Sequence, residues 1–81
     1  MKFSLTARAL RDYNSLMPSL QVRVDKQLTL LLRDLQHPSL RAKKHDESRD
    51  IWQGRVTGNY RFYFRIEGDT YKIVSIIPHP K

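Results

Sequence analysis

The sequence predicts an α+β domain over residues 1–81, in the order strand, helix, helix, strand, strand, strand. Two observations support this prediction. Apolar residues recur at helical spacing in the first half of the chain, and they alternate with polar residues in the second half. Short polar turns separate the alternating stretches, which is typical of an antiparallel meander. We therefore expect two N-terminal helices packed on one face of an antiparallel sheet.

The first strand and the first helix are expected before Pro18. Residues 2–6 alternate in polarity, which favours a short strand. Thr6 is a typical N-cap for a helix over residues 7–17, and Pro18 is expected to end it. One face of this helix would be apolar, through Leu10, Tyr13 and Met17.

The second helix is expected to be the more buried of the two. Ser19 can cap its start, and it should end near Gln36, because the residue before Pro38 is pushed out of the helical region. Additional leucines widen its apolar stripe, which consists of Val24, Leu28, Leu31 and Leu35. Residues 38–50 are densely charged and are expected to form the one long loop of the domain.

Residues 51–66 predict two strands joined by a tight turn. One alternating set is apolar: Trp52, Val56, Tyr60, Phe62, Phe64 and Ile66. The other set is cationic or hydrogen-bonding: Gln53, Arg55, Arg61, Tyr63 and Arg65. Successive side chains on a strand point to opposite faces, so one face of this sheet should be apolar and the other rich in guanidinium groups.

The length of the turn follows from the same alternation. A two-residue loop over Gly58 and Asn59 would place Arg55 on the core face, which is costly for an unpaired charge. A three-residue loop over 57–59 pairs Arg55 with Arg61 and keeps every apolar residue on one face. Gly58 and Asn59 also tolerate the left-handed conformation that we expect in such a loop. A second turn at residues 67–70 leads to a last strand that is closed by Pro78.

The charge of the chain indicates an anionic partner. Fifteen Lys and Arg residues against eight Asp and Glu residues give a formal net charge of +7. The planar fork of arginine suits phosphate, so a nucleic acid backbone is the expected ligand of the cationic sheet face. There is no cysteine, signal-peptide pattern or membrane-spanning stretch, so we expect a cytoplasmic protein that does not bind membranes. No metal-ligand spacing is present, and we expect neither a metal ion nor a cofactor.

The order of elements and several motifs resemble the RelE/ParE superfamily of toxins from bacterial toxin–antitoxin systems, across essentially the whole chain. The similarity is strongest over residues 50–64 and from the 68–70 turn to Pro78-His79. Within the superfamily the YoeB type is most similar, through Trp52, the Tyr60-Arg61 pair and His79.

This resemblance implies a ribosome-dependent messenger RNA endonuclease that an acidic antitoxin keeps silent. Such toxins act without metal: the ribose 2′-hydroxyl attacks the adjacent phosphate and leaves a cyclic phosphate and a 5′-hydroxyl. The YoeB type has a carboxylate as base where this chain has Ala42. Lys43 and Lys44 are similar to the lysines of the RelE type, and Asp46 and Glu47 are further candidates. The identity of the base stays open at this stage.

The candidate site residues follow from the two arguments together. Arg61 would stabilise charge on the phosphate, and His79 would donate or accept a proton. Arg55, Lys43 and Lys44 would contact phosphates, and Tyr63 would stack on a base.

Each of these residues also has a plainer interpretation as a solvated surface residue. Two other functions remain open for the whole chain: a ParE-like inhibitor of DNA gyrase, and a nucleic-acid-binding module without catalytic activity.

Overall fold

A five-stranded sheet in the order β1-β5-β4-β3-β2 forms the centre of the molecule. The computed structural model describes residues 1–79. Along the chain the elements are β1 (Lys2–Leu5), α1 (Ala7–Asn14), α2 (Pro18–Arg33), the 3₁₀ helix η1 (Pro38–Leu40), β2 (Lys43–Asp46), β3 (Ile51–Arg55), β4 (Tyr60–Glu67) and β5 (Thr70–Pro78). The predicted α+β class and the antiparallel meander of β3, β4 and β5 are confirmed. β1, however, lies parallel to β5.

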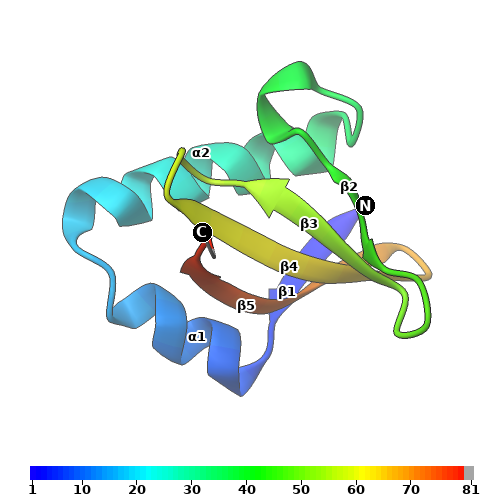
Figure 1. Cartoon of the computed structure of the whole chain (residues 1–81), viewed down its shortest axis with the longest axis horizontal. Helices are drawn as coiled ribbons and strands as arrows, with labels where there is room; N and C mark the ends of the chain where they lie inside the picture. The colour runs from blue at the N-terminus through cyan, green and yellow to red at the C-terminus, as the bar shows by residue number, and fades with distance from the viewer. Residues whose placement is uncertain (80–81) are drawn as a thin grey trace.

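The hydrophobic core lies between α2 and one face of the sheet, and Figure 1 shows α2 behind β3 and β4. From the helix, the predicted stripe supplies Val24, Leu28 and Leu31, which are almost fully buried. From the sheet, the predicted apolar set supplies the fully buried Phe62 and Phe64, whose rings stack with centroids 5.5 Å apart. These residues close the middle of this side of the sheet, and the opposite side does not face α2.

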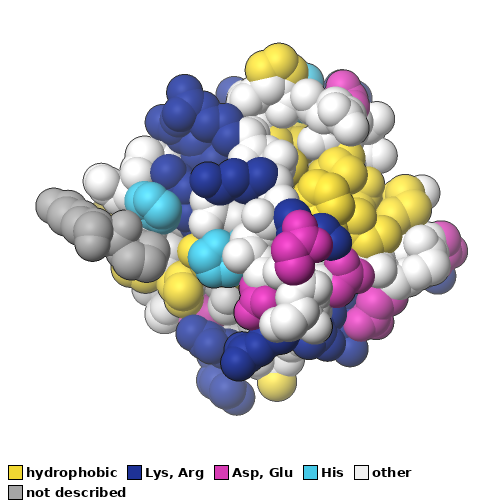
Figure 2. Space-filling model, turned by 45° about the vertical axis from the view of Figure 1, so that its right-hand side comes forward, with side chains coloured by type: hydrophobic (Ala, Val, Ile, Leu, Met, Phe, Trp, Pro, Cys, Tyr) yellow, Lys and Arg dark blue, Asp and Glu magenta, His cyan; other side chains and the backbone are white. Residues whose placement is uncertain are grey.

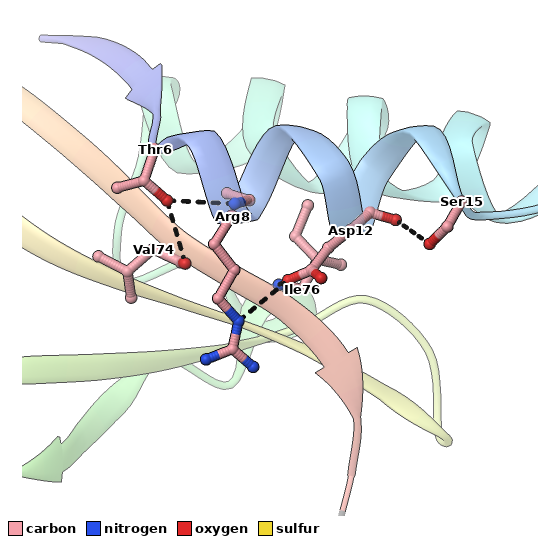
Figure 3. Close-up of polar contacts among 7 residues, drawn as sticks. Thr6, Arg8, Asp12, Ser15, Val74 and Ile76 are labelled. Atoms are coloured by element: carbon pink, nitrogen blue, oxygen red, sulfur yellow. Dashed lines mark hydrogen bonds and ion pairs between the residues drawn. The ribbon is translucent and has the colours of Figure 1, made fainter.

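Helix α1 covers an edge of β5 that no strand covers. β1 pairs only with the first part of β5, from Thr70 to Ile73. Beyond that point the hydroxyl of Thr6 donates to the carbonyl oxygen of Val74 (3.1 Å), and the N–H of Ile76 donates to Oδ2 of Asp12 (3.0 Å; Figure 3). The N-cap residue of α1 and one side chain of the helix therefore satisfy backbone groups of the end of β5.

The ends of the helices differ from the prediction in three respects. Thr6 is the N-cap of α1, as expected, but α1 ends at Asn14 rather than at residue 17. Pro18 is the first residue of α2 instead of the end of α1, because its missing N–H is no loss in a first helical turn. Ser19 is accordingly not a cap, and α2 already ends at Arg33.

The apolar face that we expected on α1 is mostly open to solvent. Leu10 is 51% exposed and Met17 is 61% exposed, and Ala9 is the buried residue of this helix.

The prediction of one long loop over residues 38–50 is wrong. It contains η1 and a fifth strand, β2, whose backbone pairs antiparallel with β3. The aliphatic stem of Lys44 brings its Nζ over the Trp52 ring (5.1 Å to the centroid), and the same Nζ pairs with Asp50. These contacts help to hold β2 on the sheet, although its residues do not alternate between apolar and polar. Among the described residues, no helix is long and apolar enough to cross a membrane.

Candidate functional site

The face of the sheet that points away from α2 carries most of the predicted site residues. Strands β3 and β4 pair Gln53 with Tyr63 and Arg55 with Arg61, as the alternation predicted. An irregularity in the pairing of β4 with β5, between Tyr63 and Phe64, gives β5 one extra residue, so that Val74 and Ser75 both belong to this face. We call it the polar face.

The middle of the polar face is covered, contrary to the expectation that Tyr63 would be free to stack on a base. Gln53 and Tyr63 are each only 7% exposed. His45, from the second irregular position in the sheet, packs edge-on against Tyr63 with ring centroids 4.9 Å apart. Tyr63 therefore supports His45 and does not present a free ring on which a base could stack.

A groove of about 390 Å³ runs along this face. It combines an imidazole, a carboxylate, two guanidinium groups and hydroxyls with aliphatic side chains, and it is lined by Arg8, His45, Asp46, Arg49, Ile51, Tyr63, Val74, Ser75 and Ile77. In Figure 2, Lys and Arg side chains lie beside histidine side chains at the left and centre of the view, and Asp and Glu side chains lie to the right of these histidines. The face thus has a cationic end and a mixed end.

The loop between β3 and β4 has the predicted length but not the predicted backbone. Neither Gly58 nor Asn59 adopts a positive φ; among residues 1–79 the residues that do so are Arg41, Asp50 and Gly68. Instead, the hydroxyl oxygen of Thr57 accepts hydrogen bonds from the backbone N–H groups of Asn59 (3.1 Å) and Tyr60 (3.2 Å), which close the turn.

Arg61 is anchored on this loop. Its Nη1 donates to the carbonyl oxygens of Thr57 (2.5 Å), Gly58 (3.3 Å) and Tyr60 (3.0 Å). Within residues 1–79 its other two guanidinium nitrogens make no hydrogen bond or ion pair. Arginine has five N–H donors, so the anchored group keeps donors for an anion while its orientation is held by the backbone.

His79 reaches the same corner of the sheet from the end of β5. Its N–H donates to the carbonyl oxygen of Asn59 (2.7 Å), which continues the β4–β5 ladder beyond Pro78. Alternation along the strand then places His79 on the side of Ile77, whose partner in β4 is Arg61. The side chain of His79 is exposed. The structure therefore brings Arg61 and His79 together around one loop.

The two other arginines of the predicted set lie at opposite ends of the face. Arg55 is half-buried, and its Nη2 is 3.7 Å from the position of a Cβ on Gly58, so it flanks the same loop as Arg61. Arg65 is opposite Lys72, far along β4 from this loop. Its Nε is buried and has no hydrogen-bond partner among the described residues.

The structure separates Lys43 from Lys44. Lys43 is exposed and pairs with Gln53, so it belongs to the polar face. Lys44 pairs with Trp52, so it lies on the opposite side of the sheet. The hydrogen bond with Asp50 raises the pKa of Lys44, so this ammonium is a stable cation. Lys44 is therefore poorly placed to act on the same phosphate as Lys43.

Two positions that were considered for the general base, Ala42 and Asp46, have other roles. The side chain of Ala42 packs against the core. The pKa of Asp46 is lowered, first by a hydrogen bond from the Ser48 hydroxyl and then by one from the backbone N–H of Arg49. Asp46 is thus a structural acceptor within its turn. Within residues 1–79 no three His, Asp or Glu side chains are grouped in a way that could hold a metal ion.

His45 is a functional candidate that the sequence analysis did not select, because the surrounding segment was expected to be a loop. The signal was its distance of two residues from Lys43, which places both on one face of a strand. The polar face thus offers two imidazoles, His45 and His79, on either side of Ile77.

No family model matches the chain. No curated protein matches it by sequence. Solved structures, in contrast, superpose over almost its full length.

A YoeB/ParE toxin from Agrobacterium tumefaciens matches with a TM-score of 0.83 and 16% identity, over 99% of this chain and 100% of the other. The toxin–antitoxin complex RelBE2 from Mycobacterium tuberculosis matches with a TM-score of 0.78 and 23% identity, over 96% of both chains. The YoeB–YefM complex from Staphylococcus aureus matches with a TM-score of 0.79 and 14% identity, over 96% of this chain and 95% of the other. At these identities the similarity shows a shared fold.

Proposed function

We propose that this chain, which has the fold of the YoeB and RelE toxins, is the toxin of a toxin–antitoxin pair and cleaves messenger RNA on the ribosome without a metal ion. The observation that carries the proposal is the corner at residues 57–59, where Arg61 is anchored by loop carbonyls and His79 is tied to the same loop. A guanidinium group and an imidazole at one exposed corner are the groups that phosphodiester cleavage needs.

Arg61 supplies charge stabilisation. When a ribose 2′-hydroxyl attacks the adjacent phosphorus, negative charge grows on the two non-bridging oxygens. The free donors of Arg61 can bind these oxygens without reorganising, because the loop carbonyls already hold the guanidinium. The same contacts mean that Arg61 also stabilises the loop.

The two imidazoles supply the proton transfers. In our proposal His45 accepts the 2′ proton, and His79 donates a proton to the 5′ oxygen as its bond to phosphorus breaks. The products are a 2′,3′-cyclic phosphate and a 5′-hydroxyl. Along β5, His79 lies two strand residues, about 6.6 Å, beyond Ile77, which lines the groove together with His45. The two imidazoles therefore occupy separate positions on the polar face, and in our proposal the RNA strand lies between them.

The partner that silences the protein is proposed to be an acidic antitoxin that covers the cationic end of the polar face. The net charge of +7 supports this proposal, since an acidic segment would neutralise the face and block Arg61 and Arg55 together. Co-purification with such a partner should give a complex that is much less basic than the toxin. A partner that left Arg55 and Arg61 accessible would contradict this mechanism of inhibition.

The function is tested by inducing the chain alone and mapping messenger RNA ends on arrested ribosomes. The parent should generate new 5′-hydroxyl ends, and Arg61→Ala should reduce their formation by about 10²-fold or more. Circular dichroism and urea unfolding must show that the variant is folded, because Arg61 also holds the loop. Lys72→Ala, which removes a cation from the distant end of the sheet, is the matched control and should cleave like the parent.

Each alternative function has its own outcome in this experiment. Arrest of DNA synthesis with intact messenger RNA would identify an inhibitor of gyrase. Growth without arrest, together with binding of RNA, would identify a binding module. Cleavage that persists in folded Arg61→Ala would exclude the proposed role of this arginine.

A further inference from the structure

A second cationic groove lies on the helix side of the same hairpin. It has a volume of about 360 Å³ and is formed by α2, the η1 segment and the end of β3. Four cations line it, together with polar groups and two apolar residues: Arg23, Lys26, Gln27, Pro38, Ser39, Arg41, Arg55 and Val56. No carboxylate of the described residues lines it, which distinguishes it from the groove on the polar face.

Among the residues that the structure describes, the cations of this groove have no acidic partners. The ion pairs among residues 1–79 join other residues, and none includes Arg23, Lys26, Arg41 or Arg55. Like charges that converge without counter-charges repel one another, so this arrangement is stabilised when an anion binds.

The walls of the groove are fixed before any ligand binds. Gln27 is 6% exposed, and its Nε2 donates to the carbonyl oxygens of Ser39 (3.1 Å) and Arg55 (2.8 Å). One side chain of α2 thereby ties both η1 and β3 to the helix. The backbone positions from which these elements present their cations are consequently set by the fold.

Arg41 supplies an independent observation. Its backbone is left-handed (φ 46°, ψ 41°) at the end of η1. A residue with a Cβ is strained there and glycine would not be. The chain therefore has a guanidinium group at a position where the backbone itself favours glycine, and that guanidinium lines the groove.

We propose that this groove is a second phosphate-binding site, which holds backbone phosphates of the RNA strand outside the cleavage corner. This inference rests on the proposed function. Arg55 connects the two sites, because it lines the groove and pairs with Arg61 across the hairpin. The ligand is an RNA backbone and not a peptide segment, since a peptide site needs apolar pockets, and only Pro38 and Val56 are apolar here.

The test measures binding of a short, fluorescently labelled single-stranded RNA with 2′-O-methyl riboses, which cannot be cleaved by attack of the 2′-hydroxyl. The variant Arg23→Gln/Lys26→Gln removes two exposed cations from the groove. The control Lys2→Gln/Arg11→Gln removes the same formal charge from β1 and α1. The groove variant should reduce the slope of log affinity against log salt by about 1.4, which is about 0.7 for each lost phosphate contact. The control should reduce it much less.

Arg41→Gly gives a second readout that a purely structural role would not produce. It should raise the unfolding midpoint by relieving the left-handed strain, and it should still lower RNA affinity. The cleavage rate on saturated ribosomes should stay at the parent value in all groove variants. The same rate should fall strongly in Arg61→Ala.

The possible failures are distinguishable. Equal slopes for the groove and control variants would overturn the site and leave long-range charge attraction as the explanation. Loss of binding to a polyglutamate peptide with unchanged RNA binding would assign the groove to an acidic protein partner instead. A parent protein that does not bind the RNA at all would overturn the groove as an RNA site, whereas a parent that creates no new messenger RNA ends on ribosomes would contradict the proposed function itself.

Discussion

Gly54→Ala should strongly destabilise the domain, because Gly54 allows the ring of Phe62 to lie against the backbone of β3. A Cβ at this position would be 2.2 Å from Cζ of Phe62, 2.5 Å from Cε1 and 2.8 Å from Cε2. Carbon atoms in contact are about 3.5–4.0 Å apart, so the ring would have to move by more than about 1 Å. Phe62 is fully buried and stacks on Phe64, which leaves it no free space.

The expected loss is about 3 kcal/mol of unfolding free energy, the upper part of the range for overpacked cores. A domain of this size has a total stability on the order of 4–12 kcal/mol, so the loss is a large fraction of it. Urea unfolding followed by the fluorescence of Trp52, the one tryptophan of the chain, measures the change directly.

Gly58→Ala is the matched control for this experiment. A Cβ on Gly58 meets only Nη2 of Arg55 at 3.7 Å, an ordinary contact, and the φ of Gly58 is not positive. Its stability should lie between the parent value and about 1 kcal/mol above it. If Gly54→Ala unfolds at the same urea concentration as the parent, the packing of Phe62 against β3 is not as described.

Three further predictions concern the polar face and its margin. His45→Gln and His79→Gln should each lower the cleavage rate by roughly 10²–10⁴-fold and each remove one limb of the pH–rate profile; an unaltered profile would return that histidine to a surface role. Lys43→Ala should reduce the salt slope of RNA binding by about 0.7, whereas Lys44→Ala should leave the slope unchanged and lower the urea midpoint, so equal slopes for both would contradict their separation. Because the pKa of Asp46 is depressed by its hydrogen bonds, the contribution of this turn to stability is complete above the ordinary carboxyl value of 3.8 and is lost as the pH falls through the lower folded value. An NMR titration of the Asp46 carboxyl carbon measures this, and a midpoint at or above 3.8 would contradict it.

The register of the β3–β4 hairpin was predictable because only two registers were considered, and they place opposite sets of side chains in the core. Pairing Arg55 with Arg61 keeps charges off the core face, and a shift by one residue does not. The strand β2 was not predictable in the same way. Residues Lys43–Asp46 are all polar, and they form a strand because β3 offers a free edge and because Lys44 can lie over Trp52. Both reasons involve residues that are distant in the sequence.

For the candidate site, the face on which most of its residues lie was predictable, and the detailed geometry was not. The alternation placed Arg61 on the cationic face, but nothing local showed that three loop carbonyls would hold its Nη1. The face of His79 depended on one backbone hydrogen bond beyond Pro78. His45 gained its position from an irregularity in strand pairing, which leaves no mark in the sequence pattern.

The pairing of β1 with β5 has a consequence for synthesis of the protein. The last strand of the sheet to leave the ribosome is also an inner one, between β1 and β4, and it joins residues near both ends of the domain, such as Lys2 and Thr70. Contacts between such distant residues are slow to form, because the long intervening chain must be ordered first. A nascent chain that has not yet released β5 has neither a closed core nor His79 beside the hairpin loop. Any activity that needs this corner therefore begins only after the whole domain has been translated. A binding partner synthesised at the same time could bind while the domain is still folding.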